Sequence, residues 1–212
     1  MTWLEPIPIK LREQALRNLE DGNVVGFLCS ASNDHGLDLV YYNKGSLLER
    51  GLYEKALLDA YSMTRVNNHH QYRELAILFA LAQRDRLVAA GVPLPGLGPF
   101  TLYRGVAGHG RARRVQGYSW TASKEVAKWF ALRPYLPDPA VFMTIADASD
   151  VLGYLNERNE QEYLLKPPLK VARVWPAKGD NIAKEREELV KRRLQKEQER
   201  FASWRKRGAV RP

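Results

Sequence analysis

The chain has 212 residues, 45% of them hydrophobic, and it carries 33 Lys or Arg against 24 Asp or Glu, a formal net charge of +9. This length and apolar content suit a globular protein with a buried core, and the basic excess favours a polyanion or an acidic partner. No run of 18 apolar residues is present to span a membrane, and residues 1–6 lack the character of a secretory signal. We therefore predict a cytoplasmic protein without a membrane partner.

The N-terminal part, residues 1–91, is predicted to be helical with one small hairpin. Residues 7–20 place apolar side chains at helical spacing and end at Asp21-Gly22, which is typical of an amphipathic helix. The runs 24–29 and 37–42 are rich in β-forming residues and flank a polar loop, so they predict the two strands of the hairpin.

Two longer helices are predicted next. Ser46 precedes Glu49 by three residues, a capping-box pattern that predicts a helix through Tyr61. A second helix is expected to begin at Asn67 or Asn68 and to end at the Gly and Pro residues of 91–93.

No metal is expected, because the residues that bind metals are not suitably spaced. Cys29 is the single cysteine and lies in an apolar run, so it is predicted to be a core residue without a disulfide. His69 and His70 are adjacent, and adjacent helical positions point to different faces, whereas a shared ligand pair needs a spacing of four.

A Pro- and Gly-rich connector over 91–99 is predicted to separate the helical part from a β-rich core over 92–176. Within this core a helix is expected to start at Thr121 or Ser123 and to stop before Pro134. The strands are expected at residues 100–104, 116–119, 140–146, 162–166 and 169–175.

Residues 177–212 form the third predicted part, a basic C-terminal helix over 181–207 with a thin apolar stripe. Two interpretations stay open. The helix is either a solvated surface laced with ion pairs such as that of Glu187 with Lys191, or an arm that binds a partner or nucleic acid.

Three separated polar signals lie in the predicted core. Arg104 follows Tyr103 in a β-like run, and the planar guanidinium of an arginine can hold phosphate with two hydrogen bonds. Strand alternation would place the hydroxyls of Ser119 and Thr121 on one face and the indole of Trp120 on the other.

The third signal is a carboxylate pair, Glu160 and Glu162. In an extended segment two residues at this spacing share a face, and like charges held close together raise the pKa of at least one of them. One carboxylate could then stabilise a sugar cation while the other moves a proton.

Together the segments Leu102-Tyr103-Arg104-Gly105, Ser119-Trp120-Thr121 and Glu160-Gln161-Glu162 resemble the mono-ADP-ribosyltransferases of the Arg-Ser-Glu, or cholera-toxin-like, class of bacterial toxins and effectors. The resemblance covers roughly residues 100–175. It implies an α+β fold whose core consists of two packed, mainly antiparallel sheets.

The resemblance also implies the roles of the site residues and the use of NAD as a consumed substrate. Glu162, Glu160, Arg104 and Ser119 would be catalytic. The dinucleotide would be bound by Arg104, Tyr103, Gly105, Ser119, Trp120 and Thr121. The glycines of Gly105-x-x-Gly108-x-Gly110 lack the Rossmann order, which agrees with NAD being consumed rather than used for hydride transfer.

Several functions stay open at this stage. The acceptor of ADP-ribose is expected to be RNA or a protein arginine, and the toxin-like resemblance implies a neutralising antitoxin or immunity protein, or a role in phage defence. The alternatives are an NAD glycohydrolase, which transfers ADP-ribose to water, and an inactive module that binds a nucleotide or a protein.

Overall fold

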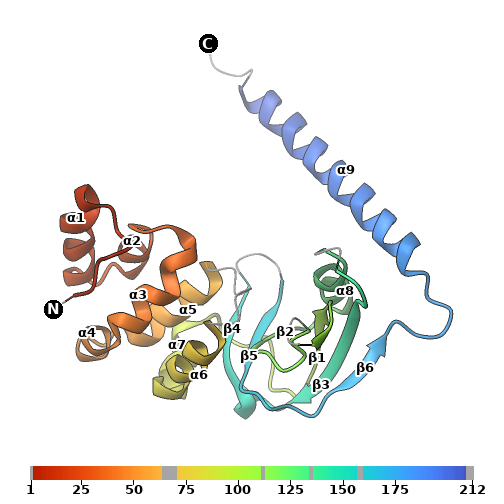
Figure 1. The fold of residues 1–212 in the computed structure, drawn as a ribbon, viewed down its shortest axis with the longest axis horizontal. Helices are drawn as coiled ribbons and strands as arrows, with labels where there is room; N and C mark the ends of the chain where they lie inside the picture. Colours follow the sequence, from red (N-terminus) through yellow and green to blue (C-terminus); the bar gives the residue numbers. More distant parts are fainter. Residues whose placement is uncertain (1, 64–70, 111–112, 134–135, 157–159, 209–212) are drawn as a thin grey trace. The chain divides into compact units, whose positions relative to one another are not determined.

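The computed structural model describes residues 2–63, 71–110, 113–133, 136–156 and 160–208. The chain is mixed α+β, which confirms the predicted class (Figure 1). It divides into two compact units: the first comprises Met1–Pro99 and Ala146–Lys166, and the second Phe100–Ile145 and Pro167–Pro212. The division into 1–91, 92–176 and 177–212 stays a prediction.

The first unit is mainly helical. Its α-helices are α1 (Ile9–Glu20), α2 (Val24–Leu28), α3 (Gly36–Tyr42), α4 (Lys44–Glu49), α5 (Tyr53–Met63), α6 (Gln71–Leu81) and α7 (Arg84–Ala90). Two short 3-10 helices, η1 (Asn33–His35) and η3 (Ala148–Asp150), and two strands, β4 (Val151–Leu155) and β5 (Glu162–Leu165), complete it. β4 and β5 pair in antiparallel register, and β4 was not among the predicted strands.

The predicted hairpin over 24–42 is wrong, because both of its strands are helices, α2 and α3. The side chain of Asn23 caps α2 by accepting a hydrogen bond from the N–H of Gly26 at 3.0 Å. Val24, Phe27 and Leu28 are all buried, which is the i, i+3, i+4 spacing of a helix face. Local capping and burial therefore override the β propensity of this run.

Cys29 was predicted to lie in the core, and this is also wrong, because its side chain is exposed. It is the C-cap residue of α2 and falls off the buried face of that helix.

The helix predicted from Ser46 to Tyr61 is divided between α4 and α5, and Ser46 lies inside α4 rather than at its cap. The break occurs at Gly51, whose φ is +69°. The N–H of Leu52 donates to the carbonyl of Leu47 at 2.9 Å, and that of Gly51 donates to Leu48 at 3.0 Å. This pair of hydrogen bonds is the Schellman motif, which ends a helix at a left-handed glycine.

The second long predicted helix is likewise divided, into α6 and α7. α7 begins after Gln83, whose N–H donates to the carboxylate of Glu54 on α5 at 3.1 Å. This tertiary cap has no local sequence signal. The caps expected at Asn67 or Asn68, and the pair His69 and His70, lie outside the described residues.

The second unit holds four of the described strands and two helices. These are β1 (Phe100–Val106), β2 (Ser119–Thr121), α8 (Lys124–Leu132), β3 (Ala140–Ala146), β6 (Ala172–Trp175) and α9 (Ile182–Gly208). The strands follow the order β2-β1-β3-β6, with β1 antiparallel to β2 and β3 antiparallel to β6. The predicted core of two packed sheets is not shown, because the described strands of this unit lie in a single sheet.

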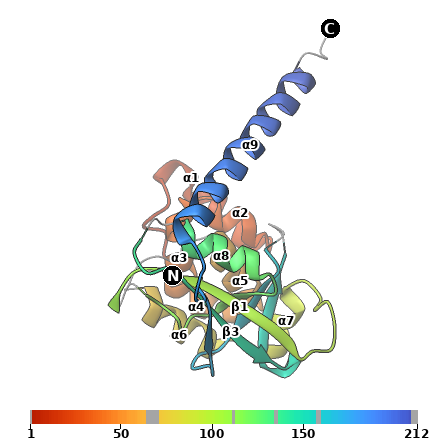
Figure 2. The same cartoon turned by 90° about the vertical axis from the view of Figure 1, so that its right-hand side faces the viewer.

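Both helices of the second unit lie where the sequence predicts them. Ser123 caps α8, since its Oγ accepts a hydrogen bond from the N–H of Val126 at 3.2 Å. The C-terminal helix is confirmed as α9, a single continuous helix in both views (Figures 1 and 2). None of the helices in the described ranges combines the length and apolar character needed to span a bilayer.

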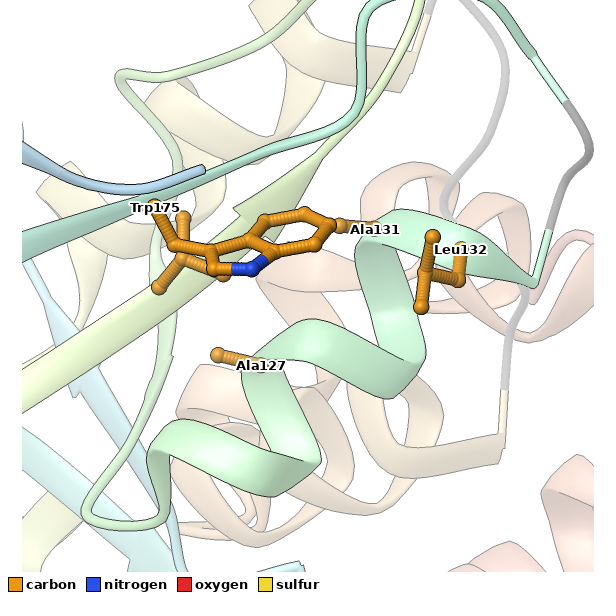
Figure 3. Packing of buried hydrophobic residues seen from close by; sticks show 5 residues of the cluster. Ala127, Ala131, Leu132 and Trp175 are labelled. Atoms are coloured by element: carbon orange, nitrogen blue, oxygen red, sulfur yellow. The ribbon is translucent and has the colours of Figure 1, made fainter. Parts of the chain in front are cut away.

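The core of the second unit forms where α8 meets the sheet. One cluster of buried residues in this core consists of Ala127, Ala131, Leu132, Val141 and Trp175. In Figure 3 the indole of Trp175 lies beside Ala127 and Ala131 of α8. Ile182 and Leu189 of α9 pack against this cluster, and the indole N–H of Trp175 donates to Glu185 at 3.2 Å. The first turns of α9 are therefore docked on the unit.

Candidate functional site

The pairing of β1 with β2 brings Arg104 next to Ser119. Tyr103 lies opposite Thr121 in the antiparallel register. Nη1 of the half-buried Arg104 donates a hydrogen bond to the carbonyl oxygen of Ser119 at 2.6 Å. Two of the three segments singled out in the sequence therefore meet within one unit.

The loop before β2 holds the other side of the Arg104 guanidinium. Nε of Arg104 donates to the carbonyl oxygen of Arg114 at 3.0 Å. A Cβ atom built on Gly117 would overlap Nη2 and Cζ of Arg104 and lie 2.9 Å from Nε. Glycine is required there for this close approach. The roles of Gly117 and of the Arg114 carbonyl were not predicted from the sequence; a glycine two residues before Ser119 was the one signal available.

Trp120 and Thr121 support this arrangement from inside the protein. Trp120 is 1% exposed, and its indole N–H donates to the carbonyl oxygen of Gly117 at 2.9 Å. Thr121 is also buried, and its Oγ1 accepts a hydrogen bond from the N–H of Ser123 at 3.1 Å. Trp120 thus fixes the loop that covers Arg104, and Thr121 fixes the start of α8. A contact of either residue with a nucleotide stays a prediction.

Tyr103 and Gly105 flank Arg104 in β1, and both contact the core of the second unit. Tyr103 is half-buried and packs against the cluster around Trp175. A Cβ on Gly105 would collide with the carbonyl oxygen of Ala127 and lie 2.8 Å from the N of Ala131. Gly105 therefore allows the backbone of α8 to touch β1 (Figure 2). These contacts give Tyr103 and Gly105 a role in packing the second unit. Their role in binding the dinucleotide stays a prediction.

Glu160 and Glu162 belong to the first unit, whereas Arg104 and Ser119 belong to the second. Glu162 is half-buried and opens β5, where it lies opposite Leu155 of β4. The intervening Gln161 has a φ of +48°, which is left-handed rather than extended. The expectation that an extended segment places both carboxylates on one face is therefore wrong, and of the two only Glu162 lies in a strand.

The turn before β5 is held by hydrogen bonding and aromatic packing. The N–H of Gln161 donates to Oδ1 of Asn156 at 3.2 Å. Tyr163 lies opposite Tyr154 of β4, with ring centroids 4.7 Å apart. Burial, and to a smaller extent the neighbouring Tyr154, raises the pKa of the Tyr163 phenol. Both rings are nearly inaccessible to solvent, so they anchor the strand that carries Glu162.

Among the described residues no group of three or more His, Cys, Asp or Glu side chains is arranged to hold a metal ion. Comparison of the chain with protein-family models, with curated proteins and with solved structures finds no match.

Proposed function

We propose that the chain is a mono-ADP-ribosyltransferase that consumes NAD. The observation that carries the proposal is the hydrogen bond of the Arg104 guanidinium to Ser119, because it joins two of the three motif segments in one strand pair. A guanidinium held by two main-chain carbonyls is preorganised, and a preorganised arginine is suited to binding the phosphates of a dinucleotide.

The proposed reaction breaks the bond between the nicotinamide nitrogen and C1′ of the ribose, and nicotinamide leaves with the electron pair. Glu162 would accept a hydrogen bond from the ribose 2′-hydroxyl and stabilise the positive charge that develops on the sugar. Glu160 would orient the acceptor and take its proton as the acceptor bonds to C1′. Arg104 would hold the phosphates, and Ser119 would position the catalytic glutamate.

The acceptor of this reaction is proposed to be a macromolecule inside a cell, either RNA or a protein arginine. The resemblance to toxins and effectors supports a role as a bacterial toxin or in phage defence, with a neutralising antitoxin or immunity protein as partner. The protein would then act in the cytoplasm.

The proposal is tested by incubating the purified protein with a cell lysate and NAD labelled in the adenylate moiety, and by measuring free nicotinamide in parallel. Release of nicotinamide with label on a macromolecule is the expected result. Label that resists protease but not RNase identifies RNA, and the reverse identifies protein. Release without macromolecular label indicates a glycohydrolase, and intact NAD leaves only the inactive binding module and contradicts the proposal.

The matched variants are Glu162→Gln and Glu20→Gln. The first removes one charge from the proposed site, and the second removes one from an exposed position in α1. We expect Glu162→Gln to lower nicotinamide release by about 100-fold or more, because it removes the charge that stabilises the sugar cation. Glu20→Gln is expected to keep full activity. A folded Glu162→Gln variant with wild-type activity would contradict the assignment.

A further inference from the structure

The charge of the chain is segregated between the two units. The first unit carries 12 Lys or Arg against 16 Asp or Glu, a net charge of −4. The second carries 21 Lys or Arg against 8 Asp or Glu, a net charge of +13. The second unit thus accounts for more than the whole basic excess of the protein, so a polyanion would be attracted to it in particular.

Ion pairs within the second unit cannot neutralise its positive charge, although several of its acidic side chains form such pairs. Asp138 contacts both Arg113 and Arg173. Glu185 contacts Lys128 at 3.1 Å. On α9, two further pairs join residues one turn apart: Lys191 with Glu187 and Arg192 with Glu188. Eight carboxylates can pair with only some of 21 cations, so most of the positive charge of this unit is not balanced by its own acidic side chains.

Positive charge is crowded at the edge strand of the sheet. Burial, and secondly the charge of Arg173, lowers the pKa of the Arg113 guanidinium, which lies 5.7 Å from the ring centroid of Phe142. Arg173 of β6 is 44% exposed, and Lys170 just before β6 is also exposed. Asp138 already bridges Arg113 and Arg173, so the exposed side chains of Arg173 and Lys170 are the cations that a bound anion could reach there.

The cations continue along α9. Lys184 is exposed, and Lys191 and Arg192 are 71% and 74% exposed in spite of their ion pairs. A helix of 27 residues is about 40 Å long, enough to follow several phosphates of a nucleic acid. Ile182 and Leu189 pack the first turns of α9 against the buried cluster, so the N-terminal end of this charged helix is held on the second unit.

The second unit also holds aromatic side chains suited to stacking against bases. Trp129 and Phe130 of α8 are half-buried, with ring centroids 4.9 Å apart. The guanidinium of Arg133 lies 4.6 Å from the centroid of Trp129 and 4.9 Å from that of Phe130. Aromatic rings combined with arginine planes bind the bases of single strands, whereas an acidic polypeptide requires only charge.

We propose that the second unit binds single-stranded nucleic acid, with the exposed cations of β6 and α9 on the phosphates and the Trp129, Phe130 and Arg133 group on the bases. This binding does not depend on the NAD reaction. Where the proposed function also holds, it makes nucleic acid the favoured acceptor of ADP-ribose.

The test is fluorescence anisotropy of the full chain, without NAD, with a labelled 20-nucleotide single strand, as RNA and as DNA, between 50 and 200 mM NaCl. Four phosphate contacts would give a slope of about −3 for log K against log salt, a loss of affinity of roughly 50-fold over this range. Binding of either polymer supports the proposal, and the polymer that binds more tightly shows whether the natural ligand is RNA or DNA. Absence of binding at 50 mM salt overturns it.

Two matched triple variants locate the surface. Lys184→Gln, Lys191→Gln and Arg192→Gln together should reduce the slope by about 2. The control removes three exposed cations from helices or helix ends of the first unit: Lys10→Gln, Arg17→Gln and Arg50→Gln. Arg17 has a Glu partner one turn away, as Lys191 does. The control should bind as the wild type does, and equal losses in both triples would overturn the proposal.

The stacking group separates nucleic acid from an acidic protein as the ligand. Trp129→Ala should weaken binding of the single strand by about fivefold or more. Polyglutamate of matched charge should bind the wild type more weakly than the single strand, and Trp129→Ala should not change this binding. Polyglutamate that binds as tightly as nucleic acid would overturn the proposal in favour of an acidic protein partner. Circular dichroism confirms that each variant is folded.

Discussion

Arg104 is fixed to Ser119 through the main chain, since its Nη1 donates to the carbonyl oxygen of Ser119 at 2.6 Å. The direction of the guanidinium is thus set by the antiparallel pairing of β1 with β2 and by the loop that ends at Gly117. A residue of the loop that never touches a substrate can therefore control the proposed phosphate-binding group.

We expect Gly117→Ala to displace the Arg104 guanidinium, because the added Cβ would overlap Nη2 and Cζ of that side chain. The proposed NAD cleavage should fall at least tenfold. Because the displaced group is a side chain rather than backbone, the free energy of unfolding should fall by only about 1 to 2 kcal/mol. Nicotinamide release and urea denaturation measure the two effects.

The control for this substitution is Gly45→Ala in α4, where an added Cβ meets no atom within 4 Å. It should leave activity unchanged and stabilise the protein by up to about 1 kcal/mol, since alanine favours the helix. Wild-type activity in Gly117→Ala would show that the position of Arg104 is not critical to the reaction.

We expect Gly105→Ala to be the more damaging substitution for stability. Its Cβ would collide with the backbone carbonyl of Ala127, and backbone moves less readily than a flexible side chain. α8 would have to shift away from β1, so the free energy of unfolding should fall by about 3 kcal/mol or more. Urea denaturation measures the change. A loss smaller than that of Gly117→Ala would contradict this order.

Some elements could be predicted from the sequence because their signals are local. The cap at Ser123 predicted α8, and short runs of apolar and β-forming residues predicted β1 and β3. The hairpin failed because Val24 and its neighbours form strands only when a partner strand is available, and here Asn23 caps a helix instead. The break before α7 could not be predicted, because Glu54, which caps that helix, is 29 residues away.

The sequence indicated which residues form the candidate site, but not the main-chain contacts that hold them in place. The sequence analysis picked out Arg104 and Ser119, and the structure joins them. No sequence pattern predicted that the main-chain carbonyl of Ser119 would hold the Arg104 guanidinium. Extended backbone was assumed around Gln161, whose left-handed φ no residue pattern indicated.

The buried carboxylate of Glu54 should be important for stability, because its side chain is 4% exposed and it bonds both Nε of Arg86 at 3.2 Å and the N–H of Gln83 at 3.1 Å. Glu54→Ala should lower the free energy of unfolding by about 2 to 3 kcal/mol. The control Glu49→Ala, at an exposed helix end, should change it by less than about 0.5 kcal/mol.

A double-mutant cycle with Arg86→Ala isolates the ion pair. Arg86 is 46% exposed and also donates from Nη2 to the carbonyl of Gly51 at 2.7 Å, so solvent weakens its pairing with Glu54. We expect a coupling energy of about 1 kcal/mol between the two residues. Additive effects would show that Glu54 stabilises the protein through the α7 cap alone.

Alkaline unfolding should depend on the buried phenol of Tyr53. Burial, and secondly the charge of Glu54, raises its pKa, and its O–H donates to the carbonyl of Leu78 at 2.8 Å. For an acid whose pKa is raised in the folded state, the stabilising contribution is complete below the unfolded pKa of about 10 and is lost as the pH rises above it. The loss should reach about 1.4 kcal/mol at pH 11, and the raised pKa of Tyr163 adds a loss in the same direction.

Tyr53→Phe separates this effect from the titration of other groups in the same pH range. At pH 8 the variant should be less stable than the wild type by about 1 kcal/mol, because the hydrogen bond to Leu78 is lost. At pH 11 the difference should shrink to near zero, since only the wild type must then keep a buried phenol protonated. Urea denaturation at the two pH values measures it. A difference that stays constant from pH 8 to pH 11 would show that Tyr53 is not titrating on unfolding.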